Sequence, residues 1–136
     1  MIVTDTNIIA YLYFPTTLSK EVEKLQQKNA EWIVPSFWKS EFMNVATAYY
    51  RKGMISYEDA LESVKQAIHV FEDFELDADI DITMSFIKKS RCSSYDCQFV
   101  ALAYQLNVKL VTYNKQILSE FPDIAIKPED YLAQFE

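Results

Sequence analysis

The stretch MIVTDTNIIA, residues 1–10, opens the chain and decides the fold. Its β-branched residues 2–4 predict a short strand. The polar pair Thr6-Asn7 can cap a helix over residues 8–13, because small polar side chains accept the free N–H groups of a first helical turn. A buried strand gains nothing in packing from a carboxylate at its end, so Asp5 needs another explanation.

Strands and helices are expected to alternate along the rest of the chain. Four further strand-forming runs fall at residues 32–34, 74–76, 109–112 and 124–126. Periodicity and capping signals predict helices at residues 18–28, 36–52, 56–71, 78–89, 94–107 and from 128 onward. Such alternation is typical of an α/β fold with a mostly parallel sheet. The 136 residues fit a single domain, 1–136.

In a parallel sheet, the ligand site lies beyond the carboxyl ends of the strands. Asp5 directly follows the first predicted strand, and Asn114 lies two residues after Thr112, at the end of another. If these strands are neighbours, both side chains share one edge of the sheet.

The composition restricts the function classes. The net charge of −7 and a pI near 4.7 argue against a broad basic face for nucleic acid, but they allow an enzyme that meets a phosphate through metal ions. Half of the residues are hydrophobic, enough for one core without a disulfide. Cys92 and Cys97 are expected to be free thiols. No apolar run could span a bilayer and no signal peptide is recognisable, so we expect a cytoplasmic protein.

Two helical carboxylates stand where apolar side chains are expected. Glu41 follows Phe37 by four residues and precedes Val45 by four, a spacing that places it in the apolar stripe with Ala48. Asp96 precedes Phe99, Val100 and Ala103 at helical spacings in the same way. Two inward carboxylates on separate helices are therefore expected to approach the core.

A group of buried carboxylates needs compensation. Burying one ionised carboxylate costs several kcal/mol, and several together also repel one another. Two remedies exist: some of the acids take up protons, or the group binds a divalent cation. The origin of the acids in three separate segments favours the cation, and oxygen ligands without His or Cys favour Mg²⁺ or Mn²⁺ over Zn²⁺. Asp5, Glu41 and Asp96 are the predicted metal-binding and catalytic residues.

Each acid taken alone also has an ordinary explanation. Asp5 can cap the helix that follows it. Asp96 can favour the dipole of its helix from the first turn. Glu41 can pair with Lys39 or Arg51 or extend to solvent. A common metal site explains all three positions at once.

The sequence resembles the PIN-domain nucleases, and within them the VapC-like toxins of toxin–antitoxin pairs. Four segments carry the resemblance: VTDTNII at 3–9, PSFWKSEFMNV at 35–45, SSYDCQFVALA at 93–103 and KLVTYNKQIL at 109–118. The resemblance spans essentially the whole chain. It implies a single three-layer domain with a mostly parallel five-stranded sheet flanked by helices. It also implies a metal-dependent endoribonuclease, with RNA as substrate, a small antitoxin as partner and a possible homodimer.

The resemblance also implies residue roles. Asp5, Glu41 and Asp96 match the metal-binding acids of the family in order. Asn114 occupies the position of a further family aspartate, where it offers a metal ligand without charge. Thr112 matches a hydroxyl residue that hydrogen-bonds beside the acids.

Asn7 matches a small polar residue that supports the acidic pocket. Lys88, Lys89, Arg91 and Lys115 are possible phosphate contacts, with a solvated helix end as the alternative for the first three. The neutral Asn114 keeps a second function open: a catalytically weak or inactive PIN-like domain that acts as an RNA- or protein-binding module.

Two other enzyme classes fit the sequence less well. A phosphatase of the haloacid-dehalogenase type needs an Asp-x-Asp motif after the first strand, but Asn7 occupies the second acidic position. A phospho-receiver domain needs an adjacent acidic pair there, which the segment TDTN at 4–7 does not provide.

Overall fold

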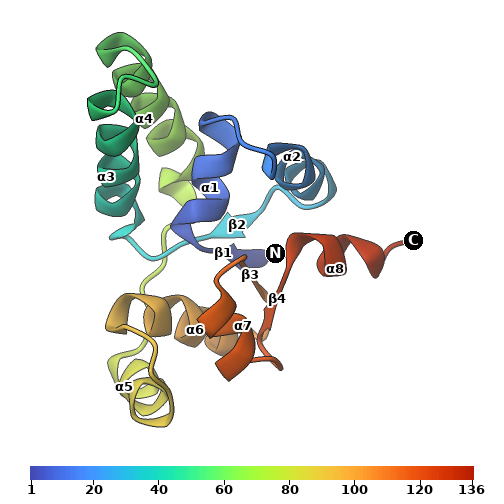
Figure 1. Ribbon diagram of the computed structural model, residues 1–136. Helices are drawn as coiled ribbons and strands as arrows, with labels where there is room; N and C mark the ends of the chain where they lie inside the picture. Colours follow the sequence, from blue (N-terminus) through green and yellow to red (C-terminus); the bar gives the residue numbers. More distant parts are fainter.

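A four-stranded parallel sheet forms the centre of the computed structural model, which describes all residues from Met1 to Glu136 (Figure 1). Its strands are β1 (Ile2–Thr4), β2 (Trp32–Ile33), β3 (Leu110–Val111) and β4 (Ala125–Ile126), in the order β2-β1-β3-β4. In register, Val3 of β1 lies opposite Ile33 on one side and Leu110 on the other. The central position of β1 brings Asp5 to the middle of the carboxyl edge of the sheet.

The predicted fifth strand, residues 74–76, is reduced to a single parallel bridge between Val34 and Glu75. Residues Glu72–Phe74 form a 3₁₀ turn, η1, which leaves little extended chain. The Glu75 carboxylate then accepts a hydrogen bond from the Trp38 indole at 2.8 Å, which ties this segment to a helix instead. The expectation of an α/β fold with a parallel sheet flanked by helices is confirmed, with four strands in place of five.

Helices cover both faces of the sheet (Figure 1). They are α1 (Thr6–Tyr13), α2 (Ser19–Lys28), α3 (Trp38–Arg51), α4 (Tyr57–Phe71), α5 (Ile80–Lys89), α6 (Ser94–Leu106), α7 (Lys115–Glu120) and α8 (Pro128–Ala133). The six-residue α7 was not expected from the sequence, because so short a helix shows no apolar period. None of the helices is both long and apolar enough to cross a membrane.

Two buried clusters form the core, one on each face of the sheet. Ile2 of β1 belongs to the cluster under α1 to α4, whereas its neighbour Val3 belongs to the cluster under α5 to α7. This alternation follows from the period of two in a strand. Cys92 and Cys97 lie in the second cluster as free thiols, as expected.

The sharp turn between α3 and α4 depends on the single glycine of the chain. Gly53 follows α3 with φ of 73°, and the N–H of Met54 donates to the carbonyl of Tyr49 at 3.0 Å. This is a Schellman-type helix end, which most side chains resist because of the positive φ. α4 can therefore return antiparallel to α3, beside α1.

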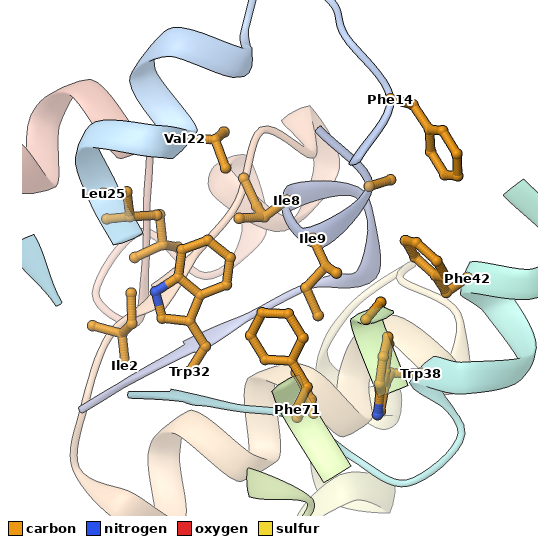
Figure 2. Close-up of a cluster of buried hydrophobic side chains, with 14 of the residues drawn as sticks. Ile2, Ile8, Ile9, Phe14, Val22, Leu25, Trp32, Trp38, Phe42 and Phe71 are labelled. Atoms are coloured by element: carbon orange, nitrogen blue, oxygen red, sulfur yellow. The ribbon is translucent and has the colours of Figure 1, made fainter. Parts of the chain in front are cut away.

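Substitution of the buried Phe71 tests the packing of the cluster under α1 to α4. Its ring lies between Trp32 and Trp38, with centroids 5.7 and 5.8 Å away (Figure 2). We expect Phe71→Ala to lower the free energy of unfolding by about 3–5 kcal/mol, because it leaves a cavity among rigid rings. Urea denaturation measures the loss. The neighbouring Val70, 42% exposed, is the control, and Val70→Ala should change stability by less than about 0.5 kcal/mol. Equal losses in the two variants would contradict this packing.

Candidate active site

Asp5 joins the ends of two neighbouring strands. It follows β1 and is the N-cap of α1, where its Oδ1 accepts a hydrogen bond from the N–H of Ile8 at 3.2 Å. Its Oδ2 accepts a hydrogen bond from the hydroxyl of Thr112, which follows β3. The Thr112 oxygen in turn accepts the N–H of Asn114 at 2.9 Å. The expected capping by Thr6-Asn7 was wrong, because the helix already begins at Thr6 and Asp5 caps it.

Glu41 reaches the same region from the first turn of α3. Its Oε1 accepts a hydrogen bond from the Thr6 hydroxyl at 2.6 Å. No ion pair holds it: Lys39 pairs with Glu75 at 3.2 Å, and Arg51 pairs with no acid. The alternative pairing of Glu41 with either cation is therefore not found.

The predicted apolar stripe of α3, Phe37, Trp38, Val45, Ala48 and Tyr49, was correct for the buried Trp38 and for Val45 and Tyr49, which pack against the core, but wrong for Ala48. The buried side chains are those of Trp38, Phe42 and Ala46, whereas Ala48 is exposed. Glu41 is half-buried at the border of this stripe. It can thus face a pocket without entering the apolar core.

Asp96 comes from the other side of the sheet, in the first turn of α6. Ser93 caps this helix, and its hydroxyl accepts the N–H of Asp96 at 3.1 Å. Phe99 and Val100 are buried, so the inward row was predicted correctly. Asp96 itself, in the first turn before these buried residues, is half-buried.

All three acids line one pocket of about 200 Å³. Three carboxylates and three amides supply most of its polar groups: Asp5, Glu41, Asp96, Asn7, Asn44 and Asn114. Sequence reasoning missed Asn44, although its position three residues after Glu41 places both on one side of α3. A larger groove of about 340 Å³ lies between α3 and α4, but it is mostly apolar and contains no carboxylate.

The acids disfavour one another's charges. Burial raises the pKa of Asp5 from 3.8 to about 6; hydrogen bonds from Thr112 and Ile8 oppose the rise, and the charges of Asp96 and Glu41 add to it. Burial also raises the pKa of Glu41 and that of Asp96. The pKa of Glu41 rises further because of the charge on Asp96. The pocket therefore concentrates negative charge in a poorly solvated place.

The donor set fits a hydrated hard cation better than a fully enclosed one. No three His, Cys, Asp or Glu side chains are arranged as a ready-made metal cage. Mg²⁺ needs no such cage, because it keeps several waters and takes one or two carboxylates directly. The Oε2 atom of Glu41 accepts no hydrogen bond from the chain, so it is free to face a ligand. An ion in this pocket would offset the burial of the Asp5 carboxylate and the smaller repulsion from Asp96 and Glu41, which together raise its pKa.

Some of the other predicted residues lie at the pocket, and the rest lie outside it. Asn7 and Asn114 line the pocket, and Thr112 contacts Asp5. Asn114 also caps α7, because its Oδ1 accepts the N–H of Ile117 at 3.0 Å. Lys115 follows it as the first residue of α7.

The remaining basic residues do not line the pocket. Lys88 and Lys89 end α5, and the ammonium of Lys89 lies 5.9 Å from the centre of the Phe86 ring. The backbone N–H of Arg91 donates to Glu120. These residues lie with the α5–α6 connection, outside the acidic pocket.

The chain is similar to known proteins in sequence and in fold. The chain is 23% identical to Ribonuclease VapC3 of Pyrobaculum aerophilum over 124 residues, which cover 89% of this chain and 95% of that protein. Its fold matches the crystal structure of PAE2754 from Pyrobaculum aerophilum with a TM-score of 0.75 and 17% identity, over 98% of this chain and 94% of the other.

A toxin–antitoxin complex from Klebsiella pneumoniae has a chain with a TM-score of 0.70 and 14% identity, over 94% of this chain and 98% of that one. The family model of the PIN domain matches residues 2–125, a range that includes β1, β2, β3 and the whole acidic pocket. The chain belongs to the PIN-domain family.

Proposed function

We propose that this protein is a metal-dependent endoribonuclease that hydrolyses RNA phosphodiester bonds, and that it is the toxin of a type II toxin–antitoxin pair. The observation that carries the proposal is the convergence of Asp5, Glu41 and Asp96 from three separate elements on one pocket. Membership of the PIN-domain family and similarity to a protein named Ribonuclease VapC3 support the reaction class. Residues 1–136 act in this proposal as one PIN-like unit.

In the proposed mechanism, Asp5, Glu41 and Asp96 hold Mg²⁺ or Mn²⁺, partly through water, and Asn114 adds an uncharged ligand. When bound, the ion would make water a better nucleophile and neutralise charge on the scissile phosphate. Thr112 and the N–H of Ile8 hold the Asp5 carboxylate in a fixed orientation. One of the acids accepts the proton of the attacking water, as a general base.

RNA must approach a protein with a net charge of −7. The cation offsets this repulsion at the pocket itself. Lys115 follows Asn114 at the start of α7, and we propose it as the basic residue that meets a phosphate beside the pocket. Lys88, Lys89 and Arg91 would meet only a longer RNA that leaves the pocket across the α5–α6 connection.

An antitoxin is the proposed protein partner. The similar structure from Klebsiella pneumoniae is a toxin–antitoxin complex, and one of its chains has this fold. A negative toxin favours a partner with basic residues, which would complement the acidic pocket that it covers. We place the pair in the cytoplasm, where Cys92 and Cys97 would persist as free thiols.

Neutral variants of the three acids test the site. We expect Asp5→Asn, Glu41→Gln and Asp96→Asn each to lower Mg²⁺- or Mn²⁺-dependent RNA cleavage by more than about 100-fold, because even residues that only support metal ligands cost 10–100-fold. Cleavage of a fluorescent single-stranded RNA measures the effect. Glu58→Gln, an exposed acid in the first turn of α4, is the matched control. Full activity in the three site variants would refute the assigned roles.

The raised pKa of Asp5 predicts a pH-dependent stability when divalent ions are removed. The folded protein holds this proton more tightly than the unfolded chain, whose Asp5 ionises near its usual pKa of 3.8. The free energy of unfolding should therefore fall as pH rises from about 4 to about 6, and then level off. The fall due to Asp5 is on the order of 3 kcal/mol, since one pKa unit equals about 1.4 kcal/mol.

Urea denaturation in EDTA at several pH values measures this fall, and Asp5→Asn isolates it because the variant cannot ionise there. At pH 7, millimolar Mn²⁺ should raise the melting temperature of the native protein by binding only the folded state. The variant should gain less. A native protein with no thermal shift at saturating Mn²⁺ would count against a metal site.

A substitution at Asn114 tests whether the protein is an enzyme or a binding module. The Oδ1 of Asn114 already caps α7, so only the second lone pair of that oxygen is left for a cation, because the amide nitrogen is a donor. Asn114→Asp keeps the capping oxygen and adds a second carboxylate oxygen, so we expect tighter Mn²⁺ binding by calorimetry and faster RNA cleavage. RNA binding without cleavage in both forms would favour the binding module instead.

A further inference from the structure

A single hydroxyl connects the first and third helices at the pocket. Thr6, the first residue of α1, donates to Oε1 of Glu41 on α3 at 2.6 Å, across 35 residues of sequence. Thr6 is only 5% exposed, so water competes little for its hydroxyl. Both residues line the pocket.

Glu41 has no other partner in the chain. Its Oε2 accepts no hydrogen bond, and the nearest cation on its helix, Lys39, is bound to Glu75. A half-buried glutamate with three free torsions can otherwise turn toward solvent, away from the pocket. Thr6 is therefore the group that fixes where this carboxylate points.

Thr6 is itself fixed relative to Asp5. Asp5 is the N-cap of α1 and Thr6 is the first helical residue, so one rigid helix end holds the Asp5 carboxylate and the Thr6 hydroxyl together. Asp5 is held on its other side by Thr112. The position of Glu41 relative to Asp5 is thus set through Thr6.

We propose that Thr6 is a positioning residue for the divalent ion: its hydroxyl holds Oε1 of Glu41 and leaves Oε2 for the pocket that Asp5 and Asp96 also line, where the three acids would hold the ion. The proposal rests on the proposed metal-dependent function. A purely structural role, in which Thr6 only ties α1 to α3, would affect stability but not the affinity for the ion in the folded protein.

Thr6→Val removes the hydroxyl at nearly constant volume, and Thr6→Ser restores it. Thr83→Val is the matched control, because Thr83 is also buried, 6% exposed, and its hydroxyl donates to the carbonyl of Asp79, the N-cap of α5, at 2.8 Å. Neither residue lines the acidic pocket. The probe is Mn²⁺ alone, with free Mn²⁺ counted by electron paramagnetic resonance. This readout does not depend on RNA cleavage.

We expect Thr6→Val to weaken Mn²⁺ binding by about 10- to 100-fold, as is typical when a partner of a metal ligand is lost. Thr6→Ser should bind Mn²⁺ within about threefold of the native protein, and Thr83→Val should not differ. In a Glu41→Gln background, Thr6→Val should cause no further loss, because Thr6 then has no carboxylate to hold.

Native Mn²⁺ affinity in a folded Thr6→Val protein, with only a lower melting temperature, would overturn the inference and leave a structural tie. If Thr6→Val does not fold, Thr6→Ala takes its place under the same criterion. A native protein that binds no Mn²⁺ would instead overturn the proposed function, so the two failures are distinguishable.

Discussion

The hydrogen bond between the Thr112 hydroxyl and the Asp5 carboxylate is the contact on which the site depends. It joins the residues that follow two neighbouring strands, β1 and β3, at the carboxyl edge of the sheet. Because β1 is central, the chain leaves it with helices from both faces close by. Asp5 can therefore cap α1 and, with the same carboxylate, face a pocket that α3 and α6 complete.

The three acids are difficult to ionise in the pocket, and neutral hydrogen-bond donors partly offset this. Desolvation raises the pKa of all three acids, and mutual repulsion adds to this for Asp5 and Glu41. Hydroxyl and backbone N–H groups from Thr112, Thr6 and Ser93 oppose the rise, without introducing a positive side chain that would compete with a cation. Neutral donors orient the acids without pairing their charge, as expected of partners that hold ligands in the proposed metal site.

Much of the fold could be predicted because local patterns and tertiary packing agree. The buried run 2–4, the glycine turn after α3 and the inward row of α6 all follow from residue types and spacing. The three acids were found because carboxylates near apolar rows are costly without a partner. The ordinary explanations of Asp5 and Asp96 also hold, since both lie at helix starts, so a helix-start acid and a pocket acid are compatible roles.

What could not be predicted depends on contacts distant in sequence. The fifth strand is reduced to one bridge beside the 3₁₀ turn η1, and the hydroxyl of Thr6 meets Glu41 only through the packing of α1 on α3.

The order of the elements along the chain has a consequence for synthesis on the ribosome. β2 and β3 flank β1, but β3 is made about a hundred residues after it, so Asp5 cannot bond to Thr112 until β3 has emerged. The helices that carry Glu41 and Asp96, α3 and α6, pack on opposite faces of the sheet. A nascent or truncated chain that ends before β3 has no assembled acidic pocket. The pocket is thus complete only after β3 has left the ribosome, although Glu41 and Asp96 are made earlier.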